Sequence, residues 1–444
     1  MSQGLTGANV ASGGGAPTDA KYIVQEPSGS LSAEQALSLL ATGLLKNLTG
    51  TGVLSIAVEG TDYYKPTGTD VAVADGGTGA STAAAARSNL GIATNISRNA
   101  VINGNFDIWQ RGTSFAAIAS DTFFADRWQI GFGTSSVQTI TRDTSVPTVA
   151  ESGILSSYSM KLDITTADAS IAAGDVNYIR NKIEGFDWKN LAQREFTLSF
   201  WVKSNLTGTN CVSFINGGFD RSYVAEYTIN SANTWEKKTI TVPASPSAGT
   251  WDYTNGIGIG VYFMSAVGST YQTTAGSWQT GFFLGTSNQV NRLATIGNNL
   301  FIAQVQLEAG AVATDFAYRP FATELSLCQR YYEKNLPIET APADGAAYQH
   351  PTVSNAHATT ALTGLGTFVV PKRATPTVTP YRSSVVGSTA GRWAYLTLIG
   401  WTESTSTAVS DISRLGFSIL VGGSGFTFGQ AYSMLGNWTA TAEI

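Results

Sequence analysis

Large apolar residues are distributed unevenly along the chain, and this imbalance separates its first part from the rest. Residues 1–95 contain three of the 47 aromatic residues but 15 of the 47 glycines. Small apolar residues alternate there with polar ones around glycines, as in LTGTGVLSIAVEG at 48–60. A segment with so little apolar bulk is not expected to bury a core of its own. We therefore predict an extended region that contains short strands.

Two short helices are predicted within this extended region. The first spans Ser32–Thr42, where Ser32 and Gln35 have the spacing of a capping box and Gly43 ends the helix. The second spans Ser81–Leu90. Helices of this length are marginal in water when isolated. We expect their apolar faces to dock onto further copies of the chain or onto a partner protein.

From residue 96 to residue 320 the aromatic residues appear and apolar and polar positions alternate with a period of two. Such alternation over many segments indicates antiparallel strands with one buried face. Roughly eight or more strands in this length fit a β-sandwich or jelly roll. The clearest segments are Tyr158–Ile164, Phe196–Val202, Ile257–Phe263 and Phe301–Leu307.

One helix and a further set of strands are predicted after residue 320. Thr323 is the expected N-cap of the helix, Leu325, Cys328 and Tyr331 or Tyr332 share one face, and Lys334 lies in its last turn. Four later segments, among them RWAYLTLIGW and SRLGFSILV, have strand patterns. The predicted fold is therefore mostly β, with an extended region at 1–95, a central sandwich at 96–320, and a helix with a small C-terminal β-sandwich at 321–444.

The composition narrows the class of protein. Charged residues make up 13% of the chain, against about a quarter in average soluble domains. The net charge is −5 and no Lys/Arg cluster stands out, so we expect no nucleic-acid partner. No run of about 18 apolar residues predicts a membrane span, and the first residues lack a secretory pattern. We expect a soluble protein made in the cytoplasm, with Cys211 and Cys328 as buried thiols and not a disulfide or zinc site.

Three segments resemble phage tail-fibre and related virion proteins. They are DGGTGASTAAAARSNLGI at 75–92, NGNFDIWQRGTSF at 103–115 with FADRW at 124–128, and VQLEAGAVATDFAYRPFATELSLCQRYYEK at 305–334. The resemblance implies a homotrimeric fibre on the virion, made in the bacterial host. It also implies that residues 1–95 attach to tail or head proteins of the particle. The jelly-roll part would resemble a carbohydrate-binding module, and the distal end would meet the host surface.

Several residues of these segments are expected to have structural roles. Arg111 is placed to pair with Asp126 or Asp107 across a strand end. Glu308 and Arg319 are candidates for an ion pair or for capping backbone groups. Phe316, Tyr318 and Pro320 would hold the last sandwich strand against the helix.

Motifs for catalysis or cofactor binding are not found. The glycines at 76–79 lack the Lys-Ser/Thr of a phosphate-binding loop, and neither GxSxG nor HExxH occurs. His350 and His357 have no nearby carboxylates, and could hold a metal only as a three-histidine site on a trimer axis. No spacing selects a carboxylate pair for glycoside hydrolysis. We therefore expect no enzymatic activity, no cofactor and no metal.

Aromatic residues in turn-rich stretches are the candidates for sugar binding, because aromatic faces and amide groups together suit a saccharide. Nearby amides are supplied by Asn255, Gln272 and Gln279. Trp201 and Trp235 lie in strand patterns and are interpreted as packing residues. The predicted glycan contacts are Trp251, Tyr253, Tyr271 and Trp278.

The functional hypothesis from sequence is a trimeric tail fibre that binds host polysaccharide or lipopolysaccharide through its distal β domains, without inserting into a membrane. A head-attached fibre or decoration with no receptor role stays open, as does a polysaccharide-degrading tail protein. Purely structural connection, with no ligand at all, is a third alternative.

The shortage of apolar bulk in the first region generates a direct prediction. A fragment of residues 1–95, expressed alone, is expected to be unfolded because it cannot bury enough apolar surface. Circular dichroism against temperature measures this, and a cooperative melting transition of the fragment would contradict the prediction.

Overall fold

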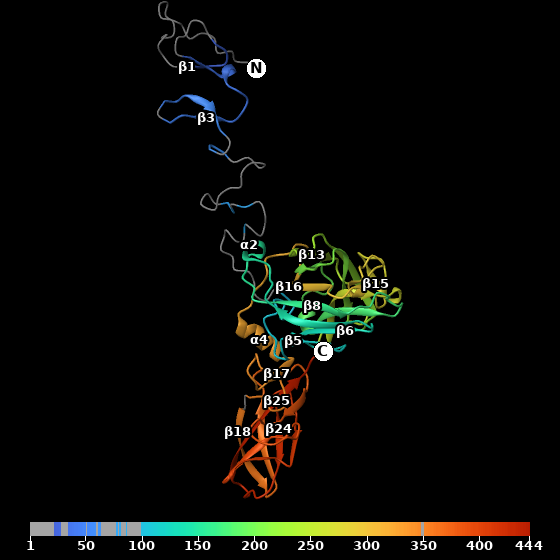
Figure 1. The fold of residues 1–444 in the computed structure, drawn as a ribbon. Helices are drawn as coiled ribbons and strands as arrows, with labels where there is room; N and C mark the ends of the chain where they lie inside the picture. Colours follow the sequence, from blue (N-terminus) through green and yellow to red (C-terminus); the bar gives the residue numbers. More distant parts are fainter. Residues whose placement is uncertain are drawn as a thin grey trace, which may run out of the picture. The chain divides into compact units, whose positions relative to one another are not determined.

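The computed structural model describes residues 22–27, 34–49, 51–58, 61–63, 77, 78, 80, 86, 99–347 and 350–444 (Figure 1). The chain divides into two compact units, Met1–Ala93 and Thr94–Ile444. The predicted mostly β fold is confirmed, since the described residues form mainly antiparallel sheets with few and short helices.

The described part of the first unit consists of short strand pairs. Strands β1 (Tyr22–Val24) and β2 (Glu34–Ala36) pair in parallel, and β3 (Leu45–Asn47) and β4 (Leu54–Ile56) pair antiparallel. The strands expected within 48–60 are thus present in part as β4. The predicted second helix lies outside the described residues except for Ala86.

The helix predicted at Ser32–Thr42 is wrong for its described part. Residues 34–36 are strand β2, followed by the 3-10 turn η1 (Leu37–Leu39). The Gln35 side chain accepts a hydrogen bond from the Leu54 backbone N–H (2.8 Å) and donates to the Leu54 carbonyl. Pairing with residues distant in sequence therefore replaces the local capping box, as tertiary contacts override weak helix propensity.

The central domain is a sandwich of two six-stranded sheets in which all paired neighbours are antiparallel. The first sheet has the order β13 (Glu236–Val242), β10 (Phe196–Lys203), β16 (Asn299–Ala309), β8 (Ser159–Thr166), β7 (Val137–Asp143), β5 (Ser114–Phe115). The second has the order β15 (Trp278–Thr280), β12 (Arg221–Ile229), β11 (Gly208–Asn216), β14 (Ile257–Val267), β9 (Val176–Glu184), β6 (Trp128–Phe132). Its short helical turns are α2 (Val149–Ser152), α3 (Gly185–Trp188), η3 (Ser269–Tyr271) and η4 (Arg292–Ala294).

The predicted alternation places one side of each strand in a shared core. Leu198 and Phe200 of β10 and Val261 and Phe263 of β14 are fully buried in the same hydrophobic cluster. A second cluster lies around Tyr262, whose neighbours in sequence point to the first core. The four strands predicted most clearly correspond to β8, β10, β14 and β16, so these predictions are confirmed.

The helix after the sandwich is α4 (Phe321–Gln329), and its N-cap is Pro320. The prediction that Thr323 caps this helix is wrong, because the N-cap lies three residues earlier, where the Pro320 carbonyl accepts from the N–H groups of Thr323 (2.9 Å) and Glu324 (3.0 Å). Lys334 lies in strand β17 (Tyr332–Lys334) and not in a last helical turn. Burial lowers the pKa of Lys334 to about 8, while its ammonium donates to the carbonyls of Gln110 (2.6 Å) and Ile338 (3.0 Å).

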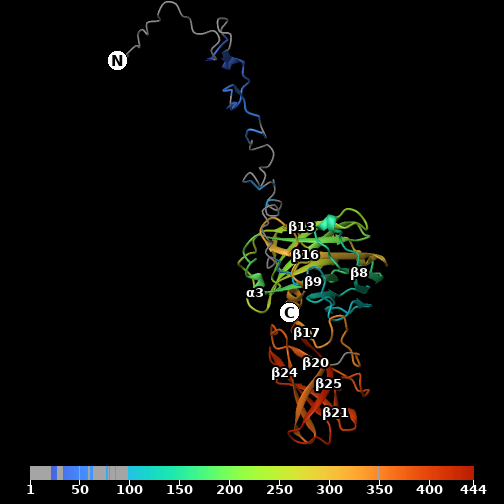
Figure 2. The ribbon, with the colours of Figure 1, turned by 90° about the vertical axis from the view of Figure 1, so that its left-hand side faces the viewer.

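The C-terminal strands form one hydrogen-bonded sheet of nine strands around the long strand β25 (Ala431–Thr441) (Figure 2). Its first half pairs with β18 and β21, and its second half pairs with β17 and β20. Residues such as Trp393, Phe417 and Trp438 fill a separate core. The remaining strands are β18 (His350–Ala358), β19 (Ala361–Thr367), β20 (Thr377–Tyr381), β21 (Ala394–Thr397), β22 (Gly400–Glu403), β23 (Ser406–Ser410) and β24 (Gly416–Gly422).

A buried ionic junction joins the sandwich to the C-terminal strands. Glu443 accepts hydrogen bonds from Arg111 (2.8 Å) and from Arg127. The two guanidinium groups stack on aromatic rings, Arg127 at 3.6 Å from the Tyr331 centroid and Arg111 at 3.7 Å from the Tyr332 centroid. The sequence segments at 103–115, 124–128 and 305–334 therefore meet at one junction.

Asp126 organises the polar part of this junction. It accepts from the Gln110 backbone N–H (2.8 Å) and side chain (2.7 Å), and lies 3.8 Å from Arg111. The predicted pairing of Arg111 with Asp126 is confirmed, whereas Asp107 bonds to Asn105 instead (3.0 Å). Burial raises the pKa of Asp126, although Arg111 and these hydrogen bonds oppose the change.

Replacing Glu443 is expected to destabilise the protein strongly. The change Glu443→Gln leaves the buried Arg127 guanidinium without a carboxylate and leaves Arg111 only Asp126, at 3.8 Å. The loss costs about 3–5 kcal/mol of unfolding free energy. Denaturant unfolding measures this cost. The matched control is Glu339→Gln, which removes an exposed carboxylate 3.1 Å from Arg142 and should cost under about 1 kcal/mol. Equal effects of the two changes would contradict a special role for the junction.

Candidate functional site

The sandwich brings two of the four predicted glycan contacts together. The Trp251 ring meets the Trp278 ring edge-on at 5.8 Å, and it stacks on Trp188 at 5.5 Å with an interplanar angle of 17°. Both indole N–H groups are occupied, because Trp251 donates to the Ala248 carbonyl (3.1 Å) and Trp278 to the Pro243 carbonyl (3.0 Å). Only partly exposed ring surface is therefore available to a ligand at this pair.

The other two predicted contacts lie apart from each other. Tyr253 is half-buried against the same sandwich core as the two tryptophans. Tyr271 belongs to the second cluster, where its ring meets Phe282 at 5.7 Å. The amide of Gln272 donates to the Val267 carbonyl (2.9 Å). The sequence grouped Tyr271 with the tryptophans by proximity along the chain, whereas the strand order assigns it to a different cluster.

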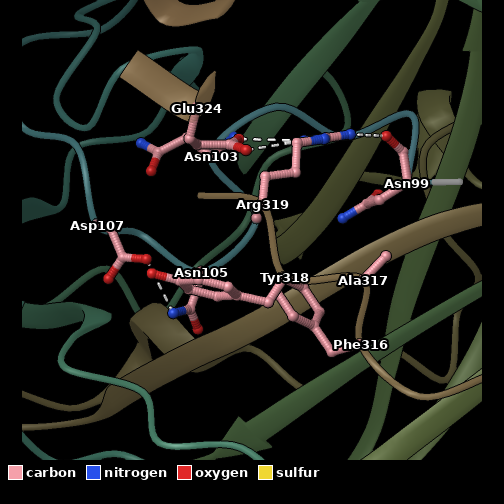
Figure 3. Close-up of a pocket in the computed structure, with 10 residues that line it drawn as sticks. Asn99, Asn103, Asn105, Asp107, Phe316, Ala317, Tyr318, Arg319 and Glu324 are labelled. Carbon is pink, nitrogen blue, oxygen red and sulfur yellow. Dashed lines mark hydrogen bonds and ion pairs between the residues drawn. The ribbon is translucent and has the colours of Figure 1, made fainter. Parts of the chain in front are cut away.

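A small cavity lies where α4 meets the start of the sandwich (Figure 3). Arg319 extends between Glu324 (3.0 Å) and the carbonyls of Asn99 and Val101 (3.1 Å to Val101). The predicted Arg319–Glu308 ion pair is thus wrong in its partner, while the capping role of Arg319 is confirmed. Glu308 instead accepts from the backbone N–H (2.8 Å) and hydroxyl (2.6 Å) of Thr314.

This cavity has a structural role. Its volume of about 10 Å³ holds at most one water molecule. Burial raises the pKa of Asp107, one of its lining residues. Asn103, also in its wall, has a left-handed backbone (φ 58°) and accepts from the Ile108 N–H (3.0 Å). Gly104 is required beside it, since a Cβ there would lie 2.1 Å from the Val305 carbonyl oxygen.

The C-terminal sheet carries a larger concavity, which we call the distal pocket. Its volume is about 660 Å³, within the range of small-ligand sites. Its aromatic wall is formed by three rings, with Phe426 at 4.8 Å from Tyr395 and 5.0 Å from Tyr432. Tyr395 and Phe426 are buried in the core of these strands, so Tyr432 is the ring with accessible surface. The remaining lining residues are Leu396, Thr397, Leu398, Ile399, Thr402, Ser424, Gly425, Thr427, Gln430, Ala431 and Ser433.

The distal pocket is uncharged, as none of its lining residues is acidic or basic. It combines aromatic rings, hydroxyl groups and one side-chain amide. Tyr432 is only partly buried, and its hydroxyl accepts from the Thr427 backbone N–H (2.9 Å) and lies 3.5 Å from the Gln430 amide oxygen. Such a lining suits a neutral, hydroxyl-rich ligand better than an anion or a cation.

The sequence analysis did not identify the distal pocket. Its residues come from β21, β22, β25 and the loop before β25, and only the paired strands bring them together. One signal was present in the sequence, because residues 393–402 and 415–442 contain no Asp, Glu, Lys or Arg.

A third concavity of about 580 Å³ opens between β18 and β19, and we call it the strand gap. Trp393, Ile419 and Trp438 are among the residues that line it. Two charged residues of β17, Glu333 and Lys334, also line it. Both are buried and have partners within the chain, since Glu333 pairs with Lys372 at 2.5 Å and Lys334 donates to the carbonyls of Gln110 and Ile338.

Within the described ranges, no group of three or more His, Cys, Asp and Glu side chains could hold a metal ion. His357 instead lies 2.8 Å from the Thr363 hydroxyl. In the same ranges, none of the helices has the length and apolar character needed to span a bilayer.

Comparison with known proteins finds similarity only among solved structures. No protein-family model matches the sequence, and no curated protein matches it. The chain is similar to the enzymatically active domain of tailspike protein 4 of bacteriophage CBA120, with 15% identity and a TM-score of 0.30, over 49% of this chain and 22% of that one. It is also similar to the carbohydrate-binding module TmCBM61 in complex with β-1,4-galactotriose (10% identity, TM-score 0.26, 48% and 99% covered). A further similarity is to the family 11 carbohydrate-binding module of Clostridium thermocellum with a mixed-linked tetrasaccharide (12% identity, TM-score 0.26, 45% and 98% covered).

Proposed function

We propose that this protein is a phage fibre protein that binds a neutral glycan of the host cell surface through the distal pocket. Residues 1–95 would attach it to tail or head proteins of the virion, and the working form would be a homotrimer. The observation that carries the glycan part is the uncharged pocket of about 660 Å³ with an aromatic wall and hydroxyl and amide groups.

The chemistry of a pyranose matches this lining. One side of the ring is covered by C–H groups, which pack against an aromatic face such as that of Tyr432, and the hydroxyls exchange hydrogen bonds with Thr, Ser and Gln side chains. Displaced water must be replaced by equivalent hydrogen bonds, and the polar groups of the pocket provide them.

The fibre part of the proposal is supported by the sequence resemblance and by the surface of the first unit. Leu39, Leu44, Leu45 and Leu48 are each more than half exposed there. Short strand pairs with exposed leucines need further contacts to be stable. Docking on symmetry mates or on a virion protein supplies such contacts.

Binding without turnover is part of the proposal, and it depends on multivalency. A single shallow pocket is expected to bind weakly, and three pockets on one rigid trimer raise the overall affinity by orders of magnitude, about 10²–10⁴-fold. The predicted contacts at Trp251, Tyr253 and Trp278 stay a prediction of a second site on the sandwich, while Tyr271 belongs to a separate cluster.

A substitution in the distal pocket tests the proposal. Tyr432→Ala is expected to weaken binding of host polysaccharide by about tenfold, the equivalent of ~1.4 kcal/mol, because the ring supplies the stacking surface. Titration calorimetry or surface plasmon resonance with purified polysaccharide measures the change.

Two further variants make the result interpretable. Tyr318→Ala removes an exposed tyrosine outside the distal pocket and should leave binding unchanged. Trp251→Ala tests the sandwich site, and loss of binding there with full binding in Tyr432→Ala would transfer the glycan site to the sandwich. Release of shortened saccharides during incubation would instead establish an enzyme.

A further inference from the structure

The strands around the strand gap form an unusually uncharged part of the protein. Five neighbouring strands of the C-terminal sheet, β25, β18, β19, β24 and β23, contain no Asp, Glu, Lys or Arg. The sandwich strands differ, since β8 carries Lys161 and Asp163 and β9 carries Arg180 and Lys182. A surface without charge is unusual for a part of a protein that faces only water.

Apolar side chains are exposed on the same strands. Val353 of β18 is 69% exposed and Leu365 of β19 is 73% exposed, while Val369 beside them is 78% exposed. Among the described residues, nine large apolar side chains are exposed within 350–444 and seven within 99–320, although the second range is more than twice as long. The exposed apolar surface is therefore concentrated in residues 350–444, on the strands and on the turns between them.

The strand gap interrupts this surface. Strands β18 and β19 are paired only from Asn355 to Ala358 and from Ala361 to Thr363, so they are unpaired before Asn355 and after Thr363. The gap of about 580 Å³ between them reaches the core residues Trp393, Ile419 and Trp438. A gap that opens onto core residues beside exposed apolar side chains indicates a contact that one chain alone does not complete.

The absence of charge indicates which molecule completes the contact at the strand gap. In a cyclic oligomer each chain meets a copy of itself, so any charge near the axis would face a like charge in a medium of low dielectric constant. A strongly charged partner would instead require complementary charges, and these five strands have none. The two charged residues that line the gap, Glu333 and Lys334, are buried and already bonded within the chain. A small ligand would fill the gap and leave Val353, Leu365 and Val369 exposed around it.

From these observations we infer that the outer face of β18 and β19, with the strand gap, is the surface through which copies of this chain associate. The inference rests on the proposed homotrimer and assigns its contact to the C-terminal strands, in addition to whatever residues 1–95 contribute. The side chains of a neighbouring copy would cover Val353 and Leu365 and enter the gap.

The mass of the full-length chain tests the inference. The wild-type protein is expected near three times 46.7 kDa, and the double variant Val353→Asp/Leu365→Asp near 46.7 kDa, because it places charges in the contact. Light scattering coupled to size exclusion gives both masses. The matched control is Leu155→Asp/Ile296→Asp, at sandwich positions that are 81% and 65% exposed, and it should keep the wild-type mass.

A cross-linking experiment covers the case in which the charged variant fails to fold. The native cysteines are buried, so Leu365→Cys offers a single accessible thiol. A short bismaleimide should convert Leu365→Cys into covalently linked chains, while Leu155→Cys should remain uncoupled.

The outcomes separate this inference from the proposed function. A trimeric wild type whose mass is unchanged in Val353→Asp/Leu365→Asp, without cross-linking at residue 365, would overturn the inference and leave the trimer standing. A monomeric wild type would overturn both the trimer and the inference. Unchanged mass with loss of polysaccharide binding would identify the strand gap as a ligand site and so also overturn it.

Discussion

The buried pairing of Glu443 with Arg111 and Arg127 is the interaction on which the arrangement of the sandwich and the C-terminal strands depends. Arg127 and Glu443 have side chains that are 1% and 6% exposed, so each charge would be costly without the other. Arg111 and Arg127 belong to the first part of the sandwich, and Glu443 follows the last strand. The junction therefore forms only when both parts of the chain have folded, and it holds β17 and β25 against the sandwich.

Neighbouring ion pairs extend this junction. Arg330 donates two hydrogen bonds to Glu184, at 2.9 and 2.7 Å, and the Tyr331 hydroxyl donates to the same carboxylate. Planar guanidinium groups make such two-point contacts with a fixed direction. Ion pairs at this junction thus fix how the sandwich and the C-terminal strands are oriented. This explains why ionisable side chains of the segments at 103–115, 124–128 and 305–334 are buried.

Five of the C-terminal strands, β25, β18, β19, β24 and β23, use the opposite chemistry. Without charges, they can recognise other molecules only through shape, aromatic surface and neutral hydrogen bonds. Such contacts depend little on ionic strength, because salt screens only charged groups. The proposed glycan site and the inferred contact between copies share this property, and both lie on strands held in place by β25. The same small domain can therefore hold both the contact between copies and a weak, uncharged glycan site.

Much of the architecture could be predicted because the period of two is a local property of the chain. The alternation in Phe196–Val202 or Ile257–Phe263 specifies a strand with one buried face wherever that strand is placed. Arg111–Asp126 could also be anticipated, since the two residues lie in turns near strand ends. Local patterns failed where a distant partner competed, as at Gln35, whose side chain bonds to Leu54, and at Arg319, which pairs with Glu324 and not with Glu308.

By itself, the sequence determined that this protein is mostly β, that its first region is poor in core-forming residues, and that its last strands lack charge. Only the tertiary structure decided which strands are neighbours. That order separates Tyr271 from Trp251 and Trp278, brings Tyr395, Phe426 and Tyr432 into one pocket, and leaves β18 and β19 apart at Val353 and Leu365. The physical reason is that sheet pairing joins residues far apart in sequence, and their contacts follow from backbone hydrogen bonds that no local pattern encodes.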